Sequence, residues 1–228
     1  MKEVPMPALT LIALLSLTCQ PAARAPRVQP VSAPQQQSTD NATNQKDLRT
    51  LYEAGKYQQV VQAVPDAVKA NQAQRPELEY LAAQSYQKLG QWDDVRKIYD
   101  ELASRGSNDV WTYVGKSGQA LMNKKTNDAV DAAQKAVQIA PANPQAQYQL
   151  GMAESLVPDF AKAAAAFQKA ALVDPTFAYA HYYAAMSYYK LKRIDLMATH
   201  FEAFLKLAPN APERPQVESI MKTVRGGV

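Results

Sequence analysis

Cysteine and histidine are almost missing from this sequence of 228 residues. Cys19 is the only cysteine, so no disulfide can form within one chain. His181 and His200 are the only histidines, and neither stands near cysteine or carboxylate residues at the spacings of metal ligands. The motifs H-E-x-x-H and G-x-S-x-G and a glycine-rich phosphate loop are missing as well. The sequence therefore predicts no catalytic residue, no metal site and no cofactor, and it favours a protein that is not an enzyme.

A strong charge of one sign is also missing. The formal net charge is +4, and the lysines and arginines are interspersed with 21 acidic residues rather than gathered in a stripe. This balance argues against a nucleic-acid partner. With only 8 glycines, many alanines and 47% hydrophobic residues, the composition favours a single all-α domain with a good core.

Long apolar runs are rare, and the clearest one lies near the N-terminus. Lys2 precedes the run from Ala8 to Leu17, which at about ten residues suits a signal peptide but falls short of the roughly 20 needed to span a bilayer. Cys19 follows this run directly, and the segment resembles the lipobox of bacterial lipoproteins. Ser16 and Thr18 depart from that pattern, so the lipobox is imperfect. The resemblance implies that residues 1–18 are a signal peptide and that Cys19 is lipidated.

A second mode of processing stays open. Ala23, Arg24 and Ala25 match the A-x-A pattern of ordinary signal cleavage, which would release a soluble periplasmic or secreted protein. If Cys19 is lipidated instead, Gln20 in the following position implies sorting to the outer membrane, on its periplasmic face. Residues 19–44 are rich in Pro, Gln, Ser, Ala and Thr and have no apolar periodicity, which predicts a disordered tether.

Beyond the tether, the sequence repeats itself with a period of 34 residues. Phe160, Ala163, Phe167 and Ala170 recur at three- and four-residue spacing, as on one face of a helix, and similar apolar patterns occur one period earlier and later. Self-similarity at this period is typical of a stacked helical solenoid.

The repeats resemble those of the tetratricopeptide repeat (TPR) family. We place their starts at Asn41, Pro76, Val110, Pro144 and Ala178. The small residue expected at the eighth position reads Leu48, Ala83, Ser117, Gly151 and Ala185, and the turn residue at the seventeenth reads Tyr57, Trp92, Thr126, Phe160 and Ile194. The helix-breaking proline near the end of a repeat is present as Pro141, Pro175 and Pro209. The resemblance implies a right-handed superhelical solenoid of about five helix-turn-helix repeats over residues 45–209.

Two parts of the solenoid are expected to be atypical. Pro65 lies inside the second helix of the first repeat, which predicts a kink or break around Val64. The third repeat has small residues where bulky ones are usual and should contribute the least packing. Residues 210–228 contain an amphipathic stretch with Val217 and Met221, which predicts a capping helix and tail.

The resemblance also implies a binding surface, because the first helix of each TPR lines a concave groove. The main groove positions are occupied by aromatic residues and methionines, namely Tyr52, Tyr80, Trp111, Tyr148, Met152, Tyr179, Tyr182, Met186 and Tyr189. Such side chains offer large contact areas to an extended peptide or an amphipathic helix. The alternative is that they only pack adjacent repeats together.

These features predict a non-catalytic scaffold or assembly adaptor of the bacterial cell envelope. Its partner would be an envelope protein or peptide segment held in the groove, the membrane would be reached through lipid on Cys19, and no small-molecule substrate is expected. One version is similarity to the pilotin lipoproteins, TPR proteins that help a secretin ring of a type IV pilus machine to assemble. The alternative is a soluble periplasmic or secreted TPR regulatory subunit, released by cleavage after Ala25.

Overall fold

The structure is a computed structural model, and it describes residues 47–106, 108–157 and 159–226. All of them belong to the second of two compact units, Gln35–Val228. The predicted signal peptide, the lipidation site Cys19, the tether of residues 19–44 and the alternative cleavage site after Ala25 lie outside the described residues.

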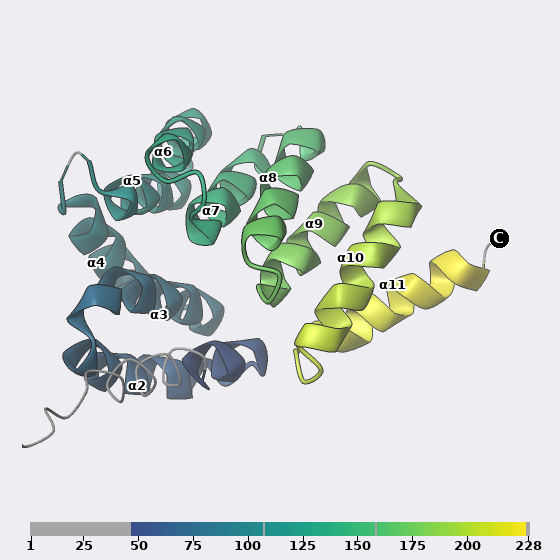
Figure 1. The fold of residues 1–228 in the computed structure, drawn as a ribbon, viewed down its shortest axis with the longest axis horizontal. Coiled ribbons are helices and arrows are strands. Elements are labelled where there is room, and N and C mark those ends of the chain that lie inside the picture. Colours follow the sequence, from purple (N-terminus) through teal and green to yellow (C-terminus); the bar gives the residue numbers. More distant parts are fainter. Residues whose placement is uncertain (1–46, 107, 158, 227–228) are drawn as a thin grey trace, which may run out of the picture. The chain divides into compact units, whose positions relative to one another are not determined.

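The described residues form helices that follow one another as pairs, with no strand among them (Figure 1). Residues 47–53 are helical and precede α2. The further elements are α2 (Tyr57–Ala70), the 3₁₀ turn η1 (Gln72–Gln74), α3 (Arg75–Leu89), α4 (Trp92–Ala103), α5 (Val110–Met122), α6 (Thr126–Ile139), α7 (Pro144–Glu154), α8 (Phe160–Val173), α9 (Ala178–Lys190), α10 (Ile194–Leu207) and α11 (Arg214–Gly226). Each of these helices from α2 onward packs against the next.

The turns inside the first, second, third and fifth repeats share one backbone conformation. Gly55, Gly90, Lys124 and Lys192 share the fifteenth position of their repeats, and all have a positive φ, at 73°, 74°, 58° and 58°. Glycine adopts this left-handed conformation without steric cost, whereas lysine does not. The second helix then begins two residues later, at the predicted turn residue of each repeat.

Side chains at the helix starts explain where the first helices of the later repeats begin. The Asn143 side chain accepts a hydrogen bond from the Ala146 N–H at 2.8 Å, and Pro144 occupies the first turn of α7. Asp109 caps α5 in the same way by accepting from the Trp111 N–H at 2.9 Å. These caps satisfy backbone donors that have no partner within the helix.

Small residues at the eighth position let paired helices approach closely. Ala83, Ser117 and Ala185 are completely buried. At Gly151 in the fourth repeat, a Cβ atom would lie 2.6 Å from the Phe167 ring of α8. A separate small cluster of buried residues is made only of alanines, namely Ala120, Ala129 and Ala133 of the third repeat and Ala153 of the fourth.

A kink or break was predicted around Val64, and the break does not occur, because α2 runs without interruption from Tyr57 to Ala70. Proline removes one backbone donor from the helix, but the Pro65 ring lies on the exposed side, while Val61, Val64 and Ala67 bury the opposite face. Packing of that face holds the helix across the proline.

The predicted capping helix is present as α11, which packs against α10. Its Val217 is completely buried and Met221 is 6% exposed. This helix therefore covers the apolar edge that the last repeat would otherwise leave open. None of the described helices is long and apolar enough to cross a membrane.

Candidate partner-binding site

The first helices of distant repeats meet on the inner side of the solenoid through aromatic rings. Tyr52, from the helical residues 47–53, lies against Tyr179 of α9 with ring centroids 5.2 Å apart. Tyr148 of α7 contacts Tyr183 of α9 at 5.7 Å. Both contacts have edge-to-face geometry, the arrangement that aromatic pairs prefer. The first and fifth repeats are therefore in direct contact.

Buried polar side chains join the same elements. The Tyr80 hydroxyl of α3 donates to the Gln149 side-chain oxygen of α7 at 2.8 Å, and the Gln149 amide donates to the Ser117 hydroxyl of α5 at 3.2 Å. Burial raises the pKa of Tyr80 and of Tyr148 well above the usual value, so both phenols stay protonated and act as hydrogen-bond donors.

Two ion pairs connect the first two repeats to the C-terminal part of the described chain. Arg49 contacts Asp174 at 2.6 Å, and its guanidinium also lies over the Phe177 ring, 5.5 Å from the centroid. Lys88 contacts Glu213 at 2.8 Å, and the Tyr179 hydroxyl donates to the other oxygen of Glu213 at 2.8 Å. We call these two sets of contacts the closing ion pairs.

The polar surroundings set the charge of Glu213. Burial acts to raise the pKa of this carboxyl, but the hydrogen bonds from Lys88 and Tyr179 outweigh burial and leave its pKa below the usual value. Lys88 has a raised pKa: burial acts to lower it, and the hydrogen bond to Glu213 overcomes that effect. The pair is therefore charged at neutral pH.

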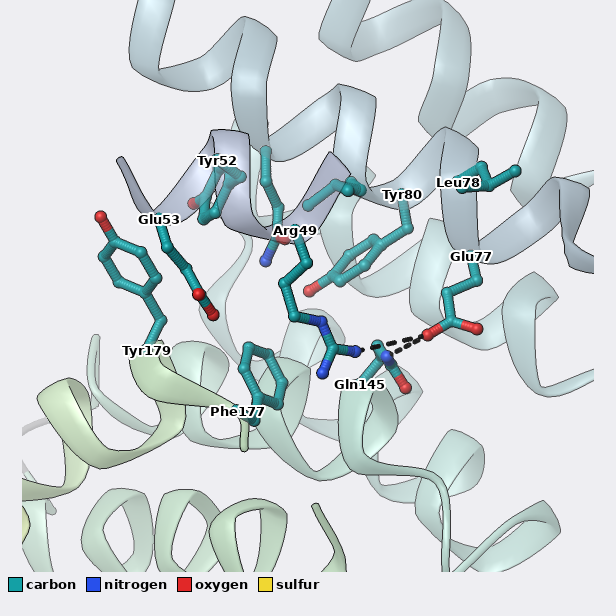
Figure 2. Close-up of a pocket in the computed structure, with 11 residues that line it drawn as sticks. Arg49, Tyr52, Glu53, Glu77, Leu78, Tyr80, Gln145, Phe177 and Tyr179 are labelled. Carbon is teal, nitrogen blue, oxygen red and sulfur yellow. Dashed lines mark hydrogen bonds and ion pairs between the residues drawn. The ribbon is translucent and has the colours of Figure 1, made fainter. Parts of the chain in front are cut away.

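A small acidic cavity lies beside Arg49 (Figure 2). Its volume is about 30 Å³, which leaves room for about one water molecule. Glu53 and Glu77 line it together with aromatic rings, and Gln145 donates to Glu77 at 2.6 Å. Burial raises the pKa of Glu53 to about 7, against the lowering effect of Arg49, while Asp174 adds to the rise. A shifted carboxyl can mark a catalytic site, but this cavity is too small for a substrate.

A larger pocket of about 230 Å³ lies next to this cavity and shares Tyr52, Tyr80 and Gln84 with it. Its other lining residues are Gln87, Lys88, Trp92, Tyr99, Leu121, Tyr148, Gln149, Met152 and Tyr183. Most of these side chains are buried or partly buried, whereas Lys88 is exposed and Trp92 is 53% exposed. We call this the inner pocket. Its aromatic, amide and thioether groups can bind an apolar side chain and hydrogen-bond to a peptide backbone.

Comparison with solved structures identifies the architecture. The protein TTC0263 of Thermus thermophilus, described as a thermophilic TPR protein, matches 78% of this chain and 97% of its own with a TM-score of 0.56 and 20% identity. The chain has the tetratricopeptide-repeat fold. MamA from Desulfovibrio magneticus RS-1 matches 73% of this chain and 94% of its own, with a TM-score of 0.44 and 20% identity. No protein-family model matches the sequence, and a search of curated proteins finds no match.

The predicted TPR groove residues fall into three groups. Tyr52, Tyr80, Tyr148, Tyr179 and Tyr182 are at most 8% exposed. Trp111, Met152 and Met186 are partly buried against the core, and Tyr189 is 41% exposed. Tyr80, Tyr148 and Met152 meet in the inner pocket together with Tyr52.

The sequence left open whether these nine residues bind a partner or pack the repeats together. Binding along all nine at once requires that the inner faces of distant TPRs stay apart. Here the first and fifth repeats touch, and the central rings contact one another. Partner binding at these residues stays a prediction, and in this conformation the inner pocket offers space for it.

Several residues of the site were not expected from the sequence. Arg49 pairs with Asp174 and Lys88 pairs with Glu213, each across 125 residues of sequence, and a repeat pattern does not predict such pairs. Tyr183, which contacts three other tyrosine rings, follows the predicted Tyr182 directly in the sequence. The run of two tyrosines was the available signal, because adjacent positions on a TPR helix can both reach a central cluster.

Proposed function

We propose that this protein is a non-catalytic scaffold or assembly adaptor of the bacterial cell envelope, which binds a segment of a partner protein at the inner pocket. The observation that carries the proposal is the pocket itself, with about 230 Å³ between buried tyrosines and the exposed Trp92. Aromatic anchors beside a desolvated pocket are typical of the residues that dominate binding energy at protein interfaces.

The lining defines the chemistry of the partner. The rings of Tyr80 and Tyr148 and the thioether of Met152 would surround one aliphatic or aromatic side chain. Gln87 is only partly buried and lines the same pocket, so its amide can pair with the backbone of the bound segment. The partner would therefore be a peptide segment with a large apolar anchor residue, in agreement with the TPR architecture.

A longer segment requires the solenoid to open. Among the remaining predicted groove residues, the buried Tyr179 and Tyr182 become accessible only if the closing ion pairs separate and the first repeat moves away from the fifth. A partner that binds only the open form would shift the equilibrium toward it, and its apparent affinity would fall by the fraction of chains that are closed. The closed form would thus protect the apolar surface until the partner is present.

Photo-crosslinking in the native cells tests the pocket. The wild type should capture an envelope protein, and Trp92→Ala should lose it. The matched control is Leu172→Ala, because Leu172 is also a large exposed apolar residue, at 72%, but does not line the pocket. If Trp92→Ala folds and captures the same partner as Leu172→Ala, the inner pocket is not the binding site.

The envelope location rests on the N-terminal sequence. We propose that Cys19 carries the lipid anchor and that residues 19–44 tether the TPR domain to the periplasmic face of the outer membrane. Mass spectrometry of the mature N-terminus distinguishes an acylated Cys19 from the alternative product that begins at Pro26. Cys19→Ser should move the protein from the membrane fraction to the soluble fraction. An unmodified Pro26 terminus in the wild type would favour the soluble regulatory subunit instead.

The pilotin version of the proposal is narrower and needs its own test. A pilotin-like role predicts that deletion of the gene leaves a secretin as monomers, and that the captured partner is this secretin. Capture of another envelope protein, with normal secretin multimers in the deletion strain, would contradict the pilotin role and leave the adaptor role in place.

A further inference from the structure

The only two histidines of the chain face each other across two helices. His181 of α9 and His200 of α10 are 19 residues apart in sequence, yet their Nδ1 atoms lie 3.1 Å from each other. His200 is 8% exposed and its ring is stacked with that of Tyr188, at a centroid distance of 5.6 Å. His181 is partly exposed, so solvent reaches the pair from one side. The site lies outside the inner pocket and both closing ion pairs.

This separation matches the bite of one transition-metal ion. Imidazole nitrogens bind Zn²⁺ at about 2.0–2.1 Å, and Cu²⁺ and Ni²⁺ also accept imidazole ligands. Two bonds of about 2.05 Å to nitrogens 3.1 Å apart enclose an angle of about 98° at the metal. That angle lies between the about 90° of square-planar coordination and the about 109° of tetrahedral coordination.

Imidazole binds metal ions in its neutral form, and histidine with its ordinary pKa of about 6.5 is mostly neutral at pH 7.

We propose that His181 and His200 together bind one divalent transition-metal ion through their Nδ1 atoms, with Cu²⁺ bound most tightly. No group of three potential ligands occurs among the described residues, so water molecules complete the coordination. Without metal, one ring donates its Nδ1 proton to the other. On metal binding this proton moves to Nε2 of the same ring, so the neutral pair loses no proton overall.

Spectroscopy on the full-length chain, purified without a polyhistidine tag, tests the site. Every version carries Cys19→Ser, so that a free thiol cannot bind the metal. Titration with Cu²⁺ at pH 7 should give one bound ion per chain, and its electron paramagnetic resonance spectrum should show two imidazole nitrogens. His181→Gln and His200→Gln should each weaken this binding at least tenfold. Because the chain has no other histidine, any imidazole signal reports this pair alone.

A control separates ligand loss from structural change. Tyr188→Phe alters the ring that stacks on His200 but removes no nitrogen, so Cu²⁺ binding should stay within twofold of the starting chain. Circular dichroism without metal shows whether each variant is folded. A spectrum without imidazole nitrogens in the folded starting chain overturns the proposal, as does equal Cu²⁺ affinity in that chain and in His200→Gln.

Discussion

Breaking the contact between Lys88 and Glu213 tests whether the closing ion pairs hold the first two repeats against the C-terminal part of the solenoid. The Glu213 side chain is 14% exposed and accepts two hydrogen bonds of 2.8 Å, from Lys88 and from Tyr179. A hydrogen bond to a charged group contributes about 1.5–3 kcal/mol, and partial exposure of Lys88 reduces this value. We expect Glu213→Gln to lower the free energy of unfolding by about 1–2 kcal/mol.

A double-mutant cycle isolates the contact. Lys88→Met, Glu213→Gln and the double variant are compared by urea unfolding at pH 7, with helicity as the signal. The coupling energy should be about 1–2 kcal/mol, because each single change removes the same interaction. A coupling energy below about 0.3 kcal/mol, the usual error of additivity, would refute the argument that this ion pair stabilises the closed form.

The pH dependence gives an independent check on the same pair. The pKa of Glu213 in the folded protein lies below the unfolded value of about 4.3. Its contribution is therefore present above that value and is lost as the pH falls through the lower folded pKa. The stability difference between the wild type and Glu213→Gln should be constant near neutral pH and shrink below about pH 4. A difference that does not change with pH would show that the charge is unimportant.

Four further substitutions test other features of the structure. The pKa of Glu53 is raised to about 7, so the contribution of this carboxyl to stability is present below pH 4.5 and is lost as the pH rises through 7. Glu53→Gln should therefore be about 1–2 kcal/mol more stable than the wild type in urea unfolding at pH 8. Equal or lower stability of the variant would contradict this. Gly90 has a φ of 74° and open space around it, so Gly90→Ala should cost about 1 kcal/mol, whereas Lys192→Gly should gain up to about 1 kcal/mol in the same assay. Gly151→Ala would place a Cβ 2.6 Å from the Phe167 ring and should cost about 1–3 kcal/mol in thermal unfolding, and an unchanged midpoint would show that the ring can move aside.

The repeat architecture could be predicted from the sequence because it depends on local signals. Pro144 with its preceding Asn143 marks a helix start, and Phe160 marks the next one at a fixed interval. These signals act within a few residues, so they can be recognised in the sequence without the tertiary structure. Pro65 was misjudged for the complementary reason: a local helix-breaking signal lost to the packing of a long apolar face.

The candidate site could be predicted only in part. The sequence predicted aromatic side chains at the groove positions, and the structure brings Tyr52, Tyr80, Tyr148 and Met152 together in the inner pocket. Whether that side is open depends on the superhelical turn summed over all repeats, and a small change per repeat decides whether Tyr52 reaches Tyr179. The histidine pair was missed because residues 181 and 200 meet only through the antiparallel packing of α9 and α10.

The contacts between the first and last repeats change how this solenoid should unfold. In an ordinary repeat array each unit interacts only with its neighbours, so the ends fray first and the stability can be summed unit by unit. Here Gly55 in the first repeat lies so close to Pro212 that an added Cβ would be 2.6 Å from its ring. Fraying at one end removes contacts from the other, so the array should melt as a single cooperative unit. Loss of α11 and the segment before it would then weaken the first repeat, at the far end of the array.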